Sequence, residues 1–89
     1  MGESIEFPQF RKLANNKNYY RIESSEKFEE VQVMGKYWWM SGLTATIYPE
    51  KLLIMDMLAC EGQRWSAIGK EEFEAFIAHC EANFERREV

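Results

Sequence analysis

The stretch GKYWWMSG, from Gly35 to Gly42, places four large apolar residues side by side between two glycines. Consecutive residues of a β-strand point to opposite faces of the sheet, so a strand through this stretch is apolar on both faces. Aromatic residues are enriched in strands, and glycines at the ends favour turns. The stretch therefore predicts a short strand inside a sheet, and it raises the question of what covers each face.

Two hairpins are expected around this strand. The run LTATIY (43–48) alternates apolar and polar residues, and the pair Ser41-Gly42 before it is typical of a turn, so the two runs predict an antiparallel hairpin. Near the N-terminus, FRKL (10–13) and YYRIES (19–24) flank the segment ANNKN. Asparagine tolerates left-handed backbone, so this segment predicts a turn between two more short strands.

The C-terminal segment GKEEFEAFIAHCEANFERRE (69–88) gives the clearest pattern. Gly69 is placed to cap a helix, the acidic residues that follow suit its first turn, and Arg86 and Arg87 suit its last turn. Five apolar residues repeat at the spacing of one helical stripe: Phe73, Phe76, Ile77, Cys80 and Phe84. We expect this stripe to cover one face of the sheet and to supply much of the core.

Two segments are ambiguous between helix and strand. In 25–34, a serine cap, Gly35 as a stop and the spacing of Phe28, Val31 and Met34 favour a helix, although an alternating strand also fits. In 49–60, Pro49 suits the first helical position and the composition favours a helix. The segment has no polar face, however, so a buried strand over 51–59 is the alternative.

These elements predict an α+β fold. We expect a small antiparallel sheet of three to five short strands, with the amphipathic C-terminal helix and one or two further short helices packed on one face. If both ambiguous segments are helices, the order is compatible with a split βαβ sandwich. Residues 7–89 are expected to form a single globular domain, and residues 1–6 a flexible N-terminus.

Composition limits the class of protein. The chain has 89 residues, of which 46% are hydrophobic and 29% are charged, as in soluble globular domains. No apolar run reaches the length of a membrane span, and the N-terminus does not resemble a signal peptide, so a cytoplasmic protein without membrane contact is expected. In that compartment Cys60 and Cys80 are expected to be free thiols rather than a disulfide.

Charge is unevenly distributed along the chain. The formal net charge is −4, but residues 1–22 hold four basic and two acidic side chains, whereas residues 23–89 hold seven basic and thirteen acidic ones. An acidic body repels a phosphate backbone, so nucleic-acid binding is disfavoured and only the N-terminal part suits it.

No constellation of residues argues for catalysis. His79 and Cys80 are neighbours on a helix and point about 100° apart, so they do not form a catalytic pair. The spacing of the two cysteines does not match a zinc site, and the glycines are scattered rather than gathered into a phosphate loop. Asp56, inside an apolar segment, is expected to be a satisfied structural acid that caps a turn or pairs with Arg64 or Lys51. We therefore expect no enzyme, no metal and no cofactor.

The remaining hypothesis is a binding module. A sheet covered on one face leaves the other open, and tryptophan, tyrosine and methionine are typical of interface centres. The sequence predicts a homodimer or a protein partner held by an aromatic sheet face, with these candidate contacts: Tyr37, Trp38, Trp39, Met40 and Tyr20. One alternative is a nucleic-acid module using the basic and aromatic N-terminal strands. Another is a small-molecule binder with an aromatic pocket.

Overall fold

A computed structural model of the chain describes residues 6–88. The predicted flexible N-terminus lies almost entirely outside these residues. The elements are β1 (Gln9–Leu13), β2 (Asn18–Ser24), β3 (Lys27–Met34), β4 (Tyr37–Thr44), α1 (Tyr48–Ala59), a 3-10 turn (Glu61–Gln63), β5 (Trp65–Ile68), α2 (Lys70–Asn83) and β6 (Glu85–Arg86). The α+β class is confirmed, and the order differs from a split βαβ sandwich because four strands precede the first helix.

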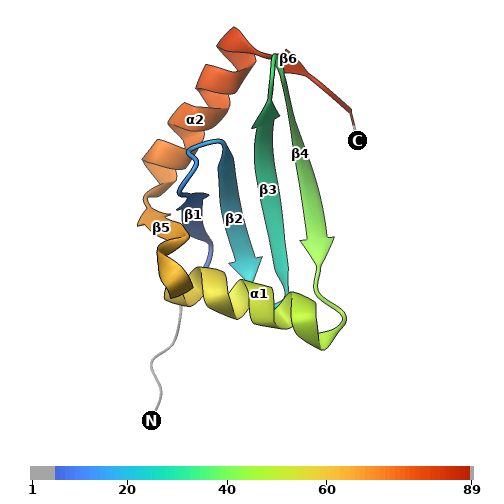
Figure 1. The fold of residues 1–89 in the computed structure, drawn as a ribbon, viewed down its shortest axis with the longest axis vertical. Helices are drawn as coiled ribbons and strands as arrows, with labels where there is room; N and C mark the ends of the chain where they lie inside the picture. Colours follow the sequence, from blue (N-terminus) through green and yellow to red (C-terminus); the bar gives the residue numbers. More distant parts are fainter. Residues whose placement is uncertain (1–5, 89) are drawn as a thin grey trace.

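The strands form one mixed six-stranded sheet in the order β5-β1-β2-β3-β4-β6. The first four strands form an antiparallel meander, and β5 pairs antiparallel with β1. The short strand β6 pairs with β4 in parallel, which makes the sheet mixed and larger than the three to five antiparallel strands expected. Figure 1 shows how α1 carries the chain from β4 to the far edge, and how α2 brings it back to β6.

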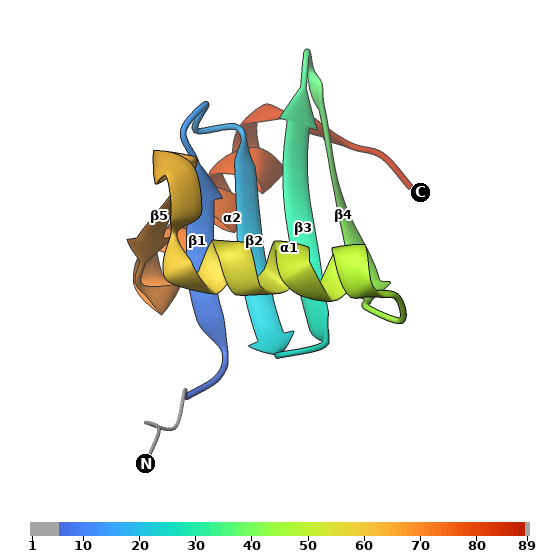
Figure 2. The same cartoon turned by 60° about the horizontal axis from the view of Figure 1, so that its bottom comes forward.

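The two helices lie on opposite faces of the sheet, not on one face as expected. Figure 2 shows α1 in front of the strands and α2 behind them. The core is therefore divided into two clusters, each between the sheet and one helix. Ile54 and Met57 of α1 anchor the first cluster, and Phe73 and Cys80 of α2 anchor the second. For the aromatic strand, this arrangement accounts for the face of Trp38 and Met40, which pack in the α2 cluster.

The segment 25–34 forms strand β3 instead of the predicted helix. In a strand, Phe28 and Val31 point to opposite faces, and each is buried in a different cluster. The three-residue spacing of Phe28 and Val31 therefore places one of them against α1 and the other against α2, and it does not mark one stripe of a helix. Gly35 does not end a helix: with a φ of 63°, it forms the turn between β3 and β4.

The predicted hairpin at Ser41-Gly42 is also wrong. Strand β4 runs without interruption through both residues, in continuous register with β3 from Tyr37 to Thr44. Because the turn at Gly35 already reverses the chain, the sheet needs no second reversal six residues later. The residues that follow β4 instead connect it to α1.

The remaining elements follow the sequence more closely. The segment 49–60 is helical, and the strands on either side of the asparagine turn are β1 and β2, with Asn16 at a φ of 59°. The apolar stripe of α2 packs against the sheet, with Gly69 at its N-cap. The helix ends at Asn83, so Arg86 and Arg87 lie beyond its last turn, in β6 and the residue after it.

Candidate interaction surface

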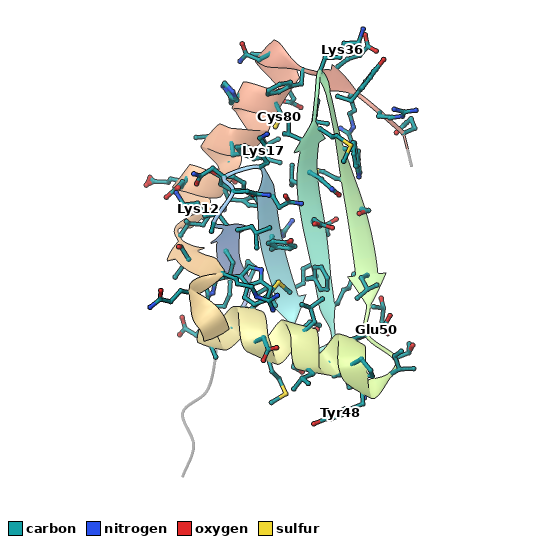
Figure 3. All side chains as sticks on the ribbon, viewed as in Figure 1. Lys12, Lys17, Lys36, Tyr48, Glu50 and Cys80 are labelled. Atoms are coloured by element: carbon teal, nitrogen blue, oxygen red, sulfur yellow. The ribbon has the colours of Figure 1, made fainter. Side chains whose placement is uncertain are left out.

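Helix α1 exposes a row of apolar side chains on the side away from the sheet. Tyr48, Leu52 and Met55 follow the i, i+4, i+7 spacing of one helical stripe, and Ile47 precedes them. Tyr48 is 72% exposed and Met55 is 58% exposed. Figure 3 shows Tyr48 pointing away from the strands at the start of the helix. We call Ile47, Tyr48, Leu52 and Met55 the outer stripe of α1.

The inner side of the same helix is fully used by the core. Ile54 and Met57 are completely buried against the sheet, and Leu58 packs beside them. An apolar outer stripe therefore cannot be explained as the side that stabilises the fold. Most of the exposed large apolar side chains of the described residues lie on α1 or immediately before it. Such concentrations on a protein surface usually mark contact sites.

The C-terminal end of α1 is held by a buried arginine. Arg11 of β1 is only 7% exposed, and its guanidinium donates hydrogen bonds to the backbone carbonyls of Met57 (2.9 Å) and Leu58 (3.1 Å). It also donates to the carbonyl of Phe10 at 2.8 Å. Carbonyl groups at a helix C-terminus carry partial negative charge, so they compensate the buried cation. Arg11 thus fixes the orientation in which α1 presents its outer stripe.

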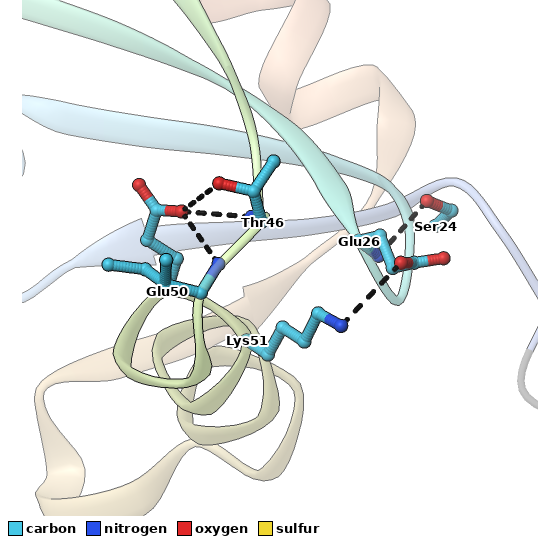
Figure 4. A network of polar contacts seen from close by, with 6 residues as sticks. Ser24, Glu26, Thr46, Glu50 and Lys51 are labelled. Atoms are coloured by element: carbon cyan, nitrogen blue, oxygen red, sulfur yellow. Dashed lines mark hydrogen bonds and ion pairs between the residues drawn. The ribbon is translucent and has the colours of Figure 1, made fainter.

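The N-terminal end of α1 is held by Glu50. Its Oε1 accepts hydrogen bonds from the backbone N–H groups of Thr46 (2.9 Å) and Ile47 (3.3 Å), as Figure 4 shows. Both bonds lower the pKa of Glu50 from its ordinary value, and the bond from Thr46 has the larger effect. Lys51 beside it approaches Glu26 at 4.0 Å and ties the helix to the β2–β3 turn.

A second apolar feature lies at the other end of the α1 side of the sheet. Met34, Tyr37 and Trp39 line an open groove of about 220 Å³ together with Arg87. The Arg87 guanidinium lies 5.0 Å from the centre of the Tyr37 ring, and Nζ of Lys36 lies 5.5 Å from the same centre. Met34 is 62% exposed. Helix α1 does not line this groove, because α1 packs near the opposite ends of these strands.

The five predicted contact residues are divided between different environments. Tyr37 and Trp39 are half-buried and line the groove. Trp38 is only 1% exposed and lies in the α2 cluster, against which Met40 also packs. Tyr20 is buried in the α1 cluster, where its hydroxyl donates to Glu30 at 3.0 Å. Burial, and then the Glu30 carboxylate, raise the pKa of Tyr20 above its usual range.

The basic and aromatic residues of β1 and β2 do not form an open face. Arg11 is buried beneath α1, Lys12 pairs with Glu72 at 3.1 Å, and Arg21 lies 3.6 Å from Glu29. Tyr19 is buried and stacks on Phe76, with ring centres 3.7 Å apart. These contacts engage several of the side chains that the nucleic-acid alternative requires, whereas Lys17 stays exposed.

The reactive side chains are also apart from one another. Cys60 caps the end of α1, whereas Cys80 lies on the buried side of α2, and both are free thiols as expected. Burial, and to a lesser extent Glu81, raises the pKa of Cys80 to about 11. His79 is exposed and contacts Asn83 rather than either cysteine. Among the side chains that the structure describes, which leave out that of Glu61, no group of three His, Cys, Asp or Glu gathers at metal-binding distance.

Asp56 and an open depression near α2 complete the description of the surface. Within the described part of the chain Asp56 makes no ion pair with Arg64 or Lys51, which was one of the two expected alternatives, and it is partly exposed on the flank of α1. An open depression of about 540 Å³ lies near the start of α2. Its lining consists of Pro8, Phe10, Arg21, Lys70, Phe73 and Glu74.

Sequence reasoning did not identify the outer stripe of α1, although the signal was present. The segment 49–60 has no polar face, which made its assignment as a helix uncertain. A helix that is apolar all round is expected to be buried on all sides. Here one side is buried and the other is open, so the absence of a polar face was itself the indication of a contact surface.

Comparisons with known proteins add no family to this description. No protein-family model, curated protein sequence or solved structure matches the chain. Within residues 6–88, neither helix has the length and apolarity needed to cross a membrane.

Proposed function

We propose that this domain is a non-catalytic interaction module that binds a protein partner through the outer stripe of α1. The observation that supports the proposal is the exposure of Tyr48 and Met55 on a helix whose inner side is already buried. Tyrosine and methionine are enriched at interface centres, where large apolar side chains are desolvated by the partner.

A rigid support favours recognition by this helix. Arg11 holds one end of α1 and Glu50 the other, so the stripe is presented without the loss of conformational freedom that a mobile segment incurs on binding. The Tyr37–Trp39 groove is a second apolar site, and a partner large enough to reach both would bury more surface. The groove retains the part of the predicted aromatic sheet face that is accessible.

The charges next to the stripe favour a protein partner over a lipid surface. Helices that lie on membranes carry basic residues beside their apolar side, because these attract anionic headgroups. Helix α1 carries Glu50 and Asp56, and its lysine, Lys51, already approaches Glu26. With a net charge of −4, the chain would be repelled by an anionic bilayer.

Site-specific photo-crosslinking tests the proposal. A photoreactive amino acid replaces Met55 in one variant and Ala82, an exposed residue of α2, in a matched control. In an extract of cells that make the protein, we expect a saturable crosslink from position 55 that excess unlabelled protein competes away. A Tyr48→Asp/Met55→Asp double variant, folded as judged by circular dichroism, should compete poorly.

Two results would reject the proposal. Crosslinking from position 55 that is no stronger than from position 82, and that unlabelled protein does not reduce, would reject the outer stripe as a binding surface. Equal competition by the double variant and the unmodified protein would reject it as well.

A further inference from the structure

Strand β4 has an outer edge that is paired over only part of its length. On one side, β4 pairs with β3 from Tyr37 to Thr44. On the other side, β6 pairs only with Tyr37 and Trp38. Figure 1 shows the chain turning away from β4 after β6. Within residues 6–88, the segment WMSGLT (39–44) therefore has no strand on its outer side.

The hydrogen bonds to β6 identify which backbone groups point outward. The carbonyl oxygens of Lys36 and Trp38 accept bonds from the N–H groups of Glu85 and Arg87, both at 2.8 Å. Backbone groups alternate in direction along a strand, and the register with β3 is unbroken. The N–H and C=O groups of Met40, Gly42 and Thr44 consequently point away from β3. They offer three donors and three acceptors.

We propose that this edge pairs antiparallel with the same edge of a second copy of the chain, about a two-fold axis that passes beside Gly42. In an antiparallel pair, residues that exchange both of their hydrogen bonds must point toward each other. Of the two-fold registers that meet this condition, the one that uses all three outward residues places Gly42 opposite Gly42 of the second copy, and Met40 opposite Thr44 on both sides of the axis. Six backbone hydrogen bonds then join two sheets into one, independently of the outer stripe of α1.

The composition of the edge favours a second copy as its occupant. Exposed edge strands are usually protected by a charge or a proline, but residues 39–44 contain neither. A charge near a two-fold axis faces its own copy and is repelled, so an uncharged strand suits self-pairing. Gly42 adds no side chain at the position where the two strands approach each other on the axis.

One pair of charges at the two ends of the edge is also complementary. Arg86 and Arg87 lie beside Trp38 at one end, between Glu85 and Glu88. At the other end, Glu50 accepts the N–H of Thr46, while Lys51 is engaged by Glu26. Antiparallel pairing brings these arginines of each copy toward Glu50 of the other, and the symmetry repeats this contact.

Sedimentation of Gly42 variants tests the pairing. A Cβ at this position meets its nearest atoms, Cγ of Glu29 and the carbonyl oxygen of Phe28, at 3.9 Å, which is ordinary contact, so a side chain fits the monomer. We expect the unmodified protein to dimerise between roughly 1 µM and 1 mM. Gly42→Lys should raise the dimer dissociation constant about tenfold or more, and the matched control Gly42→Ala should change it less than about threefold.

Amide hydrogen exchange gives a readout that needs no variant. The amides of Ser41 and Leu43 point toward β3 and should exchange slowly at every concentration. The amides of Met40, Gly42 and Thr44 should exchange quickly in dilute samples and slowly in concentrated ones. An alternating pattern of this kind identifies edge pairing, because contact through side chains alone would not follow it.

Four outcomes would overturn the inference. The first is a protein that stays monomeric at about 1 mM, and the second is a dimer that Gly42→Lys does not weaken. The third is protection of the three outward amides by another protein when no homodimer forms. The fourth is a dimer that the Tyr48→Asp/Met55→Asp variant loses and Gly42→Lys keeps. The last result would place self-association on α1. The edge pairing can therefore be rejected without rejecting the proposed function, and the proposed function without rejecting the edge pairing.

Discussion

Arg11 is the side chain whose removal should reveal most about how α1 is held. It lies on β1 beneath the C-terminal end of α1 and is almost completely buried, and the hydrogen bonds that its guanidinium donates to α1 end on backbone carbonyls. Its counter-charge is the C-terminal end of α1, reached through the carbonyls of Met57 and Leu58. Replacing Arg11 with alanine removes both bonds and leaves a cavity beneath the helix.

The expected loss follows from these contacts. A hydrogen bond in which one partner is charged contributes about 1.5–3 kcal/mol, and two such bonds to α1 are lost. Met57 keeps part of its bonding because its carbonyl also accepts the N–H of Cys60 at 3.2 Å, and water can enter the cavity. We therefore expect Arg11→Ala to lower the free energy of unfolding by about 3 kcal/mol. For a domain of this size, the melting temperature should fall by roughly 12–20 °C.

Urea unfolding monitored by tryptophan fluorescence measures this loss. Arg21→Ala is the matched control, because Arg21 lies on the opposite face, is partly exposed and makes one loose ion pair at 3.6 Å, so its removal should change stability by less than about 1 kcal/mol. A loss below about 1 kcal/mol for Arg11→Ala, equal to the control, would refute the role of Arg11 in holding α1.

Three further predictions concern individual side chains. Hydrogen bonds to the ionised form lower the pKa of Glu50 in the folded state. The stability that Glu50 gives to the fold is therefore present above its ordinary pKa of 4.5, and it is lost as the pH falls through the pKa of the folded state. Melting curves should therefore show Glu50→Gln less stable than the unmodified protein at about pH 7, with a difference that shrinks as the pH falls below 4.5; a constant difference would contradict this. Cys60 should react with a thiol reagent near neutral pH much faster than Cys80, whose pKa is raised to about 11 by burial; equal rates by mass spectrometry would be inconsistent with the buried site. Ile54→Ala should lower the free energy of unfolding by about 2–5 kcal/mol, and Leu52→Ala by less than about 1 kcal/mol; a reversed order in chemical denaturation would mean that α1 is rotated.

Elements with a local signal could be predicted from the sequence. The stripe from Phe73 to Phe84 repeats at helical spacing, and asparagines mark the β1–β2 turn, so α2 and these two strands were identified. Segment 25–34 could not be assigned locally. Phe28, Val31 and Met34 fit a helix as well as a strand, and the choice depends on a second helix covering the other face of the sheet. That is tertiary information, which overrides propensity.

The candidate site shows the same limit. The sequence indicated that aromatic residues around Trp38 were important, but it could not say which of them are accessible, because that depends on which face each helix covers. Trp38 is buried beneath α2, whereas Tyr37 and Trp39 line a groove on the other side. The outer stripe of α1 was visible only as a missing polar face, which a buried strand explains equally well.

The most direct test of this account is the oxidation of two methionines on the same helix. Met55 is 58% exposed on the outer stripe, and Met57 is completely buried. With dilute hydrogen peroxide and peptide mass spectrometry, the purified protein should form sulfoxide at Met55 much faster than at Met57, and the rate at Met55 should fall when a partner is bound. Equal oxidation of the two methionines, or protection of Met55 in the isolated monomer, would contradict an α1 that presents its outer stripe to a partner.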